Sequence, residues 1–324
     1  MSERDLIGCS VDLRRLELPM SPALRTSHGT WVAREAVLVR VKTVSGVHYG
    51  EAGVVPGFGG ATIEDLVEAA RLWRGRPVWR PGEGLESYPE EWQFCIWTAL
   101  NWGSELPSQL PTACLRPLGE VVDGGGGRYP GVVKVKIGLG QMVLEREEVL
   151  RGLERLEEGR RLRLDANGGL GEEWLGNLGE ILNHPRLEYL EQPFPPQSNL
   201  YEHRMVQAYS GKIALDESVR TYSEGATVLE SGWNGWMVCK PSLAGWPDDA
   251  ILGHPRSVIS SAFETPVGWL GVALLAARNP KNLPGLDTLS RFGEPFGSQE
   301  SNGVIPLEGL RDRAPVLWEL GVPL

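Results

Sequence analysis

The chain has few cysteines, no long hydrophobic run and no excess of positive charge, and each shortage excludes a class of protein. Its four cysteines, among 324 residues, are far apart and form no CxxC pair. A disulfide framework is therefore not indicated, and free thiols in a reducing cytoplasm are expected. The formal net charge of −10 argues against nucleic acid or an anionic membrane surface as the main partner. The charged N-terminus, MSERDLIGCS, and the short apolar run GWLGVALLAA predict neither a signal peptide nor membrane insertion.

Hydrophobic residues make up 41% of the chain and charged residues 23%, which is enough to bury a sizeable core in one large domain or two. Residues 35–44 alternate apolar and polar side chains before a turn-rich segment, a pattern typical of a strand and hairpin. Residues 61–75 have apolar positions at helical spacing, after a threonine cap and up to Gly75. The first hundred residues therefore predict a small α+β module.

From about residue 110, short strand patterns alternate with helical ones, which indicates parallel βαβ units that can close into a barrel. The expected strands are VVKVKIG, RLRLDAN, LEYLEQPF, KIALDES, WMVCKPS and SVISSAF. The expected helices are MVLEREEVLRGLERL, EEWLGNLGEILNH, LYEHRMVQAYS and TYSEGATVLES. We expect an α+β capping domain at 1–105, a barrel at 106–290, and a segment at 291–324 that returns to the capping domain. The unit before VVKVKIG is short and glycine-rich, so its boundary stays open.

Four charged residues follow the expected strands at nearly constant spacing. Asp165, Glu191, Asp216 and Lys240 are 26, 25 and 24 residues apart, which suits one strand–helix unit of a parallel barrel. Side chains at the C-terminal ends of such strands converge on one site. The sequence therefore predicts three carboxylates near a lysine.

The three carboxylates offer oxygen ligands only, with no histidine or cysteine at matching positions. Such a set favours Mg²⁺, or Mn²⁺, over zinc. Alternatively, each carboxylate is a helix cap or an exposed surface group. That explanation does not account for three carboxylates at nearly the same spacing. Glu217 is expected to face away from the site, because adjacent side chains on a strand point to opposite faces.

Lys134 and Lys136 are two residues apart on an expected strand, so both point into the barrel mouth. Buried amines are costly there unless carboxylates or a charged ligand meet them. They can simply form salt bridges to the carboxylates. Alternatively, neighbouring positive charge lowers the pKa of one amine, which then takes a proton from carbon next to a carboxylate while a metal stabilises the enediolate. Lys240 would face the substrate from the opposite side.

Other polar positions are candidates for substrate binding. Arg163 shares the inward face of Asp165 and can bind a substrate carboxylate or pair with a neighbouring acid. Ser260 and Ser261 end a later strand, and Gly285 ends another. Small polar groups and backbone N–H groups at these places can hold an anionic tail.

The ordered motifs KxK, DAN, EQP, DE and KP resemble the enolase superfamily, in its muconate-lactonising branch. Within it, RTSHG, EAGVVPGFGG, RLDANGG, VCKPSLAG, VISSAFET and LPGLDTL resemble the o-succinylbenzoate synthase family. The resemblance implies an α/β fold: a modified (β/α)7β TIM barrel with an N-terminal capping domain that the C-terminal tail completes. It also implies a metal-dependent lyase that dehydrates 2-succinyl-6-hydroxy-2,4-cyclohexadiene-1-carboxylate to o-succinylbenzoate in menaquinone or phylloquinone biosynthesis.

Carried over by position, the resemblance implies a role for each candidate. Mg²⁺ would be bound by the three carboxylates, and Lys136 would remove the proton alpha to the ring carboxylate and then help the hydroxyl leave. Lys240 would stabilise the enolate, and Lys134 would tune Lys136. Arg163 would support the ring carboxylate, and Ser260 with Gly285 would meet the succinyl tail. The loops RTSHG and VVPGFGG would cover this small anionic substrate.

Two other functions remain possible at this point. An N-acylamino acid racemase or dipeptide epimerase of the same branch also needs lysines on both sides of the site, although Asp287 here lacks the DxD pattern of a peptide-binding late strand. A non-catalytic ligand-binding barrel predicts a broken set of charged residues, whereas this set is complete. The oligomeric state, the choice between Mg²⁺ and Mn²⁺, and the final quinone stay open.

Overall fold

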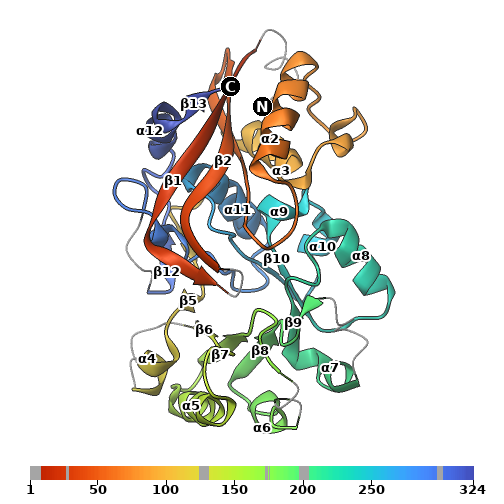
Figure 1. The fold of residues 1–324 in the computed structure, drawn as a ribbon, viewed down its shortest axis with the longest axis vertical. Coiled ribbons are helices and arrows are strands. Elements are labelled where there is room, and N and C mark those ends of the chain that lie inside the picture. The colour runs from red at the N-terminus through yellow and green to blue at the C-terminus, as the bar shows by residue number, and fades with distance from the viewer. Residues whose placement is uncertain are drawn as a thin grey trace.

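The computed structural model describes residues 9–26, 29–123, 131–171, 174, 176–196, 204–297 and 302–324. The chain forms an antiparallel sheet with its helices and a curled parallel sheet with its helices, drawn one above the other in Figure 1. The architecture is a modified TIM barrel under a capping domain, as the sequence predicts. The C-terminal strand pairs with the first strand, so the last residues return to the unit that the first residues build.

The capping domain is a four-stranded antiparallel sheet in the order β13-β1-β2-β3, with helices against one side. Its elements are β1 (Ser10–Thr26), β2 (Gly29–Thr43), β3 (Gly46–Gly53), β13 (Val322–Pro323), α2 (Ile63–Gly75), η1 (Leu85–Ser87) and α3 (Glu90–Asn101). The Thr62 side chain accepts from the Asp65 amide, and the Asp65 carboxylate accepts from the Thr62 amide, which starts α2. The predicted hairpin and the helix that ends at Gly75 are confirmed, whereas the sequence pattern does not predict β1.

The barrel strands are parallel and neighbours in space follow their order in the chain. They are β5 (Cys114–Leu115), β6 (Val132–Lys136), β7 (Arg161–Asp165), β8 (Leu187–Glu191), β9 (Ile213–Leu215), β10 (Trp236–Cys239) and β11 (Ser257–Ile259). The helices between and after them are α4 (Leu118–Val122), α5 (Met142–Arg155), α6 (Gly179–Leu182), α7 (Arg204–Ala208), α8 (Tyr222–Glu230), α9 (Pro241–Ala244), α10 (Asp249–Leu252) and α11 (Pro266–Arg278), with η6 (Ser210–Lys212) before β9.

The barrel is closed by a short extended segment at residues 284–286. The Gly285 amide donates to the Ile259 carbonyl at 2.9 Å, which attaches the segment to β11. On its other side, the Ala113 amide donates to the Pro284 carbonyl at 2.8 Å, next to β5. This segment takes the place of an eighth strand and brings Gly285 beside Ser260.

Two predicted helices differ from the structure. The helix expected over 172–184 is reduced, in the part that the structure describes, to the four residues of α6, and Gly176 before it disfavours helix. Residues 172, 173 and 175 lie outside the described residues. Of the helix expected from residue 200, α7 covers Arg204–Ala208, and residues 200–203 lie outside the description. Of the glycine-rich stretch before VVKVKIG, residues 124–130 lie outside the described residues.

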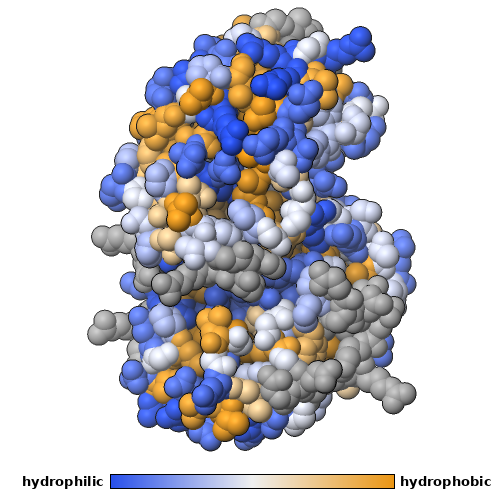
Figure 2. Space-filling model, viewed as in Figure 1, coloured by the Kyte–Doolittle hydropathy of each residue, from blue (hydrophilic) through white to orange (hydrophobic). Residues whose placement is uncertain are grey.

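The C-terminal part crosses from the barrel to the capping domain. It contains η7 (Leu289–Arg291), β12 (Val304–Pro306), which pairs with β4 (Gln109–Pro111), and α12 (Arg313–Leu320) before β13. One buried apolar cluster includes both Phe94 of α3 and Trp269 of α11, so the two units share a core. On the face in Figure 2, hydrophobic residues are interspersed with hydrophilic ones. No helix of the described part is long and apolar enough to cross a membrane.

Candidate active site

The strand ends bring the predicted charged residues to one edge of the barrel. Lys136 at the end of β6 is in register with Asp165 at the end of β7, which is in register with Glu191 at the end of β8. Asp216 follows β9 directly, and Lys240 follows β10. Because all these strands are parallel, their C-terminal ends meet at the same edge of the sheet.

Amines and carboxylates alternate within this cluster. Lys134 Nζ lies 3.0 Å from Asp165 Oδ2 and 2.7 Å from Glu191 Oε1. Lys136 Nζ lies 3.4 Å from the same Asp165 oxygen, and Lys240 forms an ion pair with Asp216. The salt bridges that the sequence left open are therefore present: one set joins Lys134 and Lys136 to Asp165 and Glu191, and a separate pair joins Lys240 to Asp216.

The pKa values within the cluster follow from burial and neighbouring charge. Burial raises the pKa of Asp165, but Lys134 and Lys136 outweigh it and hold that pKa below its ordinary value. Burial and the charge of Asp165 raise the pKa of Glu191. For Lys134 and Lys240, burial lowers the pKa, but the carboxylates outweigh it and raise the pKa above its ordinary value. The carboxylates therefore favour the charged, ion-paired form of Lys134 and Lys240.

The donor set fits a hard divalent cation. Asp165, Glu191 and Asp216 are each at most 3% exposed, and Glu191 Oε2 is buried with no hydrogen-bond partner among the described residues. A cation bound there would satisfy that oxygen, and carboxylate oxygens are the ligands that Mg²⁺ and Mn²⁺ prefer. Across the described residues, no three acidic, histidine or cysteine side chains are close enough together to hold a metal ion as they stand, and Lys134 lies between Asp165 and Glu191.

Asn167 and Glu217 also belong to the site. The Asn167 side-chain oxygen contacts Lys136 Nζ, and its Nδ2 donates to Glu217 Oε1 at 3.0 Å. The expectation that Glu217 faces away is wrong, because it lines the cavity beside Lys240. β9 ends at Leu215, so the alternation of faces along a strand no longer applies at Glu217. The DAN and DE motifs contain these two residues, but spacing alone does not give their direction.

Two adjoining hollows form the cavity above the cluster. One of about 110 Å³ is lined by lysines, carboxylates and predicted tail-binding residues, among them Lys134, Lys136, Asp165, Asp216, Lys240, Ser260, Ser261 and Gly285. The other, of about 70 Å³, is lined by Trp31, Val55 and Phe58 of the capping domain, and it shares Lys136 and Lys240 with the first. The capping domain therefore forms the roof of the site. Of the predicted loop RTSHG, Ser27 and His28 lie outside the described residues.

The predicted tail-binding residues lie at the end of β11 and on the closing segment beside it. Ser260 Oγ donates to the Gly285 carbonyl at 3.2 Å, and the Ser261 hydroxyl lies 2.8 Å from that of Thr288. Ser260, Ser261 and Gly285 all line the larger hollow. These contacts hold small polar groups at the cavity wall.

Of the two roles considered for Arg163, the structure shows an ion pair with a neighbouring acid and not a position for binding a substrate carboxylate. Its Nε lies 2.6 Å from Glu188 Oε2, and its Nη2 donates to the Leu283 carbonyl at 2.8 Å. The side chain is 1% exposed and is not among the residues that line the larger hollow. Arg163 therefore pairs with a neighbouring acid and links β7 to the closing segment.

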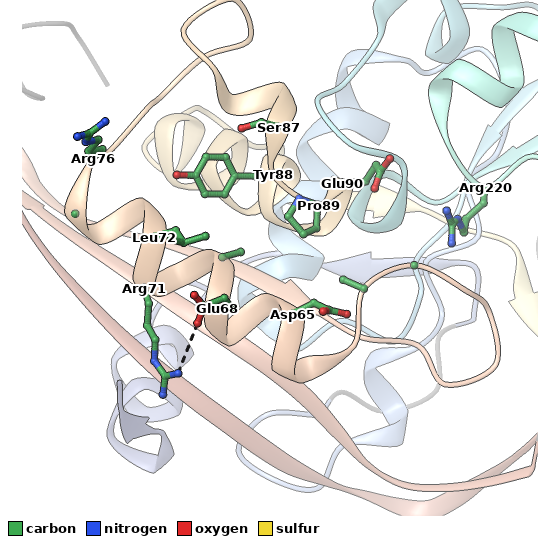
Figure 3. A pocket seen from close by; sticks show the side chains of 14 residues that line it. Asp65, Glu68, Arg71, Leu72, Arg76, Ser87, Tyr88, Pro89, Glu90 and Arg220 are labelled. Carbon is green, nitrogen blue, oxygen red and sulfur yellow. Dashed lines mark ion pairs between the residues drawn. The ribbon is translucent and has the colours of Figure 1, made fainter.

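A groove larger than these two hollows lies elsewhere on the described surface. It measures about 1060 Å³ and lies between α2 and the segment around Tyr88. Figure 3 shows Glu68 and Arg71 on α2, paired at 3.7 Å, and Arg220 at the other end of the groove. None of the three carboxylates or three lysines of the cluster lines it. The predicted catalytic and metal-binding residues are therefore at the barrel mouth and not in this groove.

Comparisons with known proteins agree with this geometry. A model of the family described as enolase C-terminal domain-like matches residues 125–245. An o-succinylbenzoate synthase of Thermosynechococcus vestitus is 31% identical over 274 residues, which cover 78% of this chain and 83% of that protein. Another from Aliivibrio fischeri strain MJ11 is 26% identical over 328 residues, 94% of this chain and 97% of that protein.

Solved structures show the same fold. The structure of o-succinylbenzoate synthase from Thermosynechococcus elongatus, complexed with Mg in its active site, has a TM-score of 0.78 at 26% identity and covers 95% of this chain and 99% of that one. A dipeptide epimerase from Enterococcus faecalis, complexed with Mg and L-Leu-L-Tyr, has a TM-score of 0.73 at 18% identity, with coverage of 92% and 96%. The second likeness shows the fold alone.

Proposed function

This chain belongs to the o-succinylbenzoate synthase family of the enolase superfamily, and we propose that it catalyses that family's dehydration. The substrate would be 2-succinyl-6-hydroxy-2,4-cyclohexadiene-1-carboxylate and the products o-succinylbenzoate and water, a step of menaquinone or phylloquinone biosynthesis. The observation that carries the proposal is that Lys136 and Lys240 line one small cavity, from strands that are four positions apart in the barrel.

Lys136 would act first as base and then as acid. As the neutral amine, Nζ takes the proton from the carbon next to the ring carboxylate, and the electron pair of that C–H bond moves into the carboxylate system. The same proton then goes from the ammonium to the hydroxyl oxygen as the C–O bond breaks, which releases water and leaves the aromatic ring. Asn167 contacts Lys136 Nζ and orients it during both transfers.

Lys240 would remain an ammonium throughout. Carboxylates outweigh burial and keep its pKa raised, so it supplies a fixed positive charge next to the negative charge that develops on the substrate. Lys134, between Asp165 and Glu191, would place a second positive charge two residues from Lys136. Asp165, Glu191 and Asp216 would hold Mg²⁺ or Mn²⁺, which when bound supplies electrostatic stabilisation of the enolate.

Dipeptide epimerisation is the alternative function, because a dipeptide epimerase also uses two lysines that face each other across the site. A peptide substrate carries an ammonium group that needs an uncompensated carboxylate in the cavity wall. Asp287 lines the wall, but its Oδ2 lies 3.4 Å from Arg116 Nη1 and accepts from the Leu115 amide at 3.3 Å. Because the charge of Asp287 is already compensated, this part of the wall offers an ammonium group no free carboxylate, whereas Ser260, Ser261 and Gly285 offer small polar groups to an anionic tail.

The test is an absorbance assay of aromatic product formation from the cyclohexadiene substrate, with Mg²⁺ and with chelator. We expect turnover that depends on the metal. Solvent deuterium exchange at the alpha carbon of a dipeptide is the parallel measurement. If deuterium exchanges into dipeptides and the cyclohexadiene is not converted, the proposal is overturned in favour of the epimerase. If neither reaction occurs, the chain is a binding protein.

A further inference from the structure

A buried polar group joins the capping domain to the barrel beside the cavity. Arg34 on β2 and Glu51 on β3 are 3% and 1% exposed, and Arg34 Nε lies 3.4 Å from Glu51 Oε1. Neither residue lines the cavity described above. Both side chains nevertheless contact segments whose residues line the cavity. A buried charge is tolerated only where such polar partners stabilise it.

Glu51 reaches from the capping sheet to the first turn of α11. Its carboxylate accepts from the Thr265 amide at 3.2 Å, the Thr265 hydroxyl at 2.5 Å and the Gly268 amide at 3.0 Å. A carboxylate at a helix N-terminus satisfies free amides and is favoured by the helix dipole. A Cβ at position 268 would lie 3.0 Å from the Glu51 carboxyl carbon, so Gly268 permits this close approach.

Arg34 ties together two segments that carry cavity residues. Its Nη1 donates to the Val54 carbonyl at 2.7 Å and to the Ala262 carbonyl at 3.4 Å. Val54 begins the loop that carries Val55 and Phe58 over the cavity. Ala262 precedes Phe263, whose backbone has φ 59° and whose side chain lines both hollows. One guanidinium therefore sets the distance between the roof loop and the wall.

The barrel side holds the same wall segment in place. Both oxygens of the buried Glu264 carboxylate accept from the Ala262 amide at 2.9 Å, and one also accepts from the Ser242 hydroxyl. Trp31 packs edge-on against Phe263 with ring centroids 6.0 Å apart. The segment 260–265 is thus anchored from below by Glu264 and from above by Arg34 and Glu51.

We propose that Arg34 and Glu51 are positioning residues: they fix the roof loop 54–60 against the wall segment 260–265 and so set the shape of the cavity that receives the substrate's tail. Neither residue touches the reacting atoms. Their loss should weaken substrate binding and leave the proton transfer at Lys136 largely intact. The kinetic part of this inference rests on the proposed function, whereas the structural part does not.

The test compares Arg34→Lys and Arg34→Met with wild type in the full chain. Lysine keeps a positive charge beside Glu51 but cannot span both carbonyls, and methionine keeps only the apolar stem. Hydrogen–deuterium exchange at residues 54–60 and 260–265 should become faster in both variants. With the cyclohexadiene substrate, KM should rise about tenfold for Arg34→Lys, since a charged hydrogen bond is lost, while kcat stays within about threefold.

Arg15→Met is the matched control, because Arg15 pairs with Glu35 at 2.8 Å within the capping sheet and has no contact with the wall segment among its described bonds. It should change neither readout. If Arg34→Met does not fold, Arg34→Lys and Thr265→Val, which removes a hydroxyl donor to Glu51, decide the question. Unchanged exchange at both segments, or a fall in kcat with KM unaltered, would overturn the inference. If wild type shows no turnover, the proposed function is refuted instead. The exchange data would still show whether Arg34 and Glu51 hold the two segments in place.

Discussion

The Nζ of Lys240 lies 4.0 Å from the centroid of the Phe58 ring. The lysine follows β10 of the barrel, and the phenylalanine belongs to the loop after β3 of the capping domain. Because the face of an aromatic ring attracts an ammonium group, this contact ties the roof loop to a lysine that the proposed reaction uses. The roof loop therefore contacts one of the charged groups of the site directly.

Phe58→Leu keeps an apolar side chain in the roof but removes the aromatic face. A cation–π contact is worth about 0.5–2 kcal/mol depending on desolvation, so kcat/KM should fall about 2- to 30-fold. Steady-state kinetics with the cyclohexadiene substrate measure the effect. Phe58→Tyr, which keeps the ring, is the control and should stay close to wild type; an equal loss in both would mean that the ring face is irrelevant.

Lys136→Ala should abolish the dehydration while the protein stays folded. The side chain is both the base and the acid of the proposed reaction, and a positioned acid–base group contributes about 10²–10⁴-fold to a rate. The absorbance assay measures the loss, and circular dichroism checks the fold. Lys281→Ala, which removes an exposed lysine that contacts only the Gly253 carbonyl among its described bonds, should keep full activity. A Lys136→Ala rate near that of wild type would make the mechanism wrong.

Glu191→Gln should remove the stabilisation of the protein by Mg²⁺. A ligand that binds only the native state adds about 2.7 kcal/mol to the free energy of unfolding at a hundred times its Kd, so Mg²⁺ should raise the Tm of wild type. The glutamine variant keeps the shape but loses one ligand charge. Thermal unfolding across a Mg²⁺ titration, with chelator as reference, gives the answer. Glu180→Gln, at a largely exposed position paired with Arg146, should respond as wild type, and an equal response from Glu191→Gln would exclude it as a ligand.

The sequence predicts the barrel half of the molecule well, because each functional side chain follows a short apolar strand at a nearly constant interval. Register along parallel strands then places Lys136, Asp165 and Glu191 together without further information. The direction of Glu217 and the ion pair of Arg163 are not predictable in this way. The first lies beyond the end of its strand, and the second depends on which acid of a neighbouring strand comes within reach.

The capping domain is harder to predict from the sequence. The sequence pattern shows the β2–β3 hairpin and α2, but β1 contains prolines and alternates poorly, and its partner β13 is at the far end of the chain. The contact between Glu51 and α11 joins residues 214 and 217 positions apart. Nothing local signals such a contact, because it arises only when the capping sheet is placed on the barrel.

Glu91 should make the stability of the protein depend on pH. It lies in the first turn of α3, is 1% exposed, and its Oε1 accepts from the Ala61 amide at a long 3.3 Å. Its pKa is raised from 4.5 to about 7, mainly by burial and to a smaller extent by the charge of Glu90, while hydrogen bonds from the Glu91 and Ala61 amides and the charge of Arg220 oppose the rise. The native state therefore binds a proton between pH 4.5 and about 7 that the unfolded state has already released.

The difference in bound protons determines whether the free energy of unfolding rises or falls with pH. As pH rises from about 4.5, the unfolded state is deprotonated first, so the free energy of unfolding falls until about pH 7 and is constant above it. One pKa unit corresponds to about 1.4 kcal/mol, which limits the effect of this shift to about 3.5 kcal/mol. Glu91→Gln cannot ionise, so its stability relative to wild type should be greatest at pH 8 and smallest near pH 4.5. Urea unfolding at a series of pH values measures this, with Glu68→Gln, at an exposed position of α2, as the control that should run parallel to wild type. A Glu91→Gln curve that also ran parallel would mean that the buried carboxyl is ionised in the native state across the whole range.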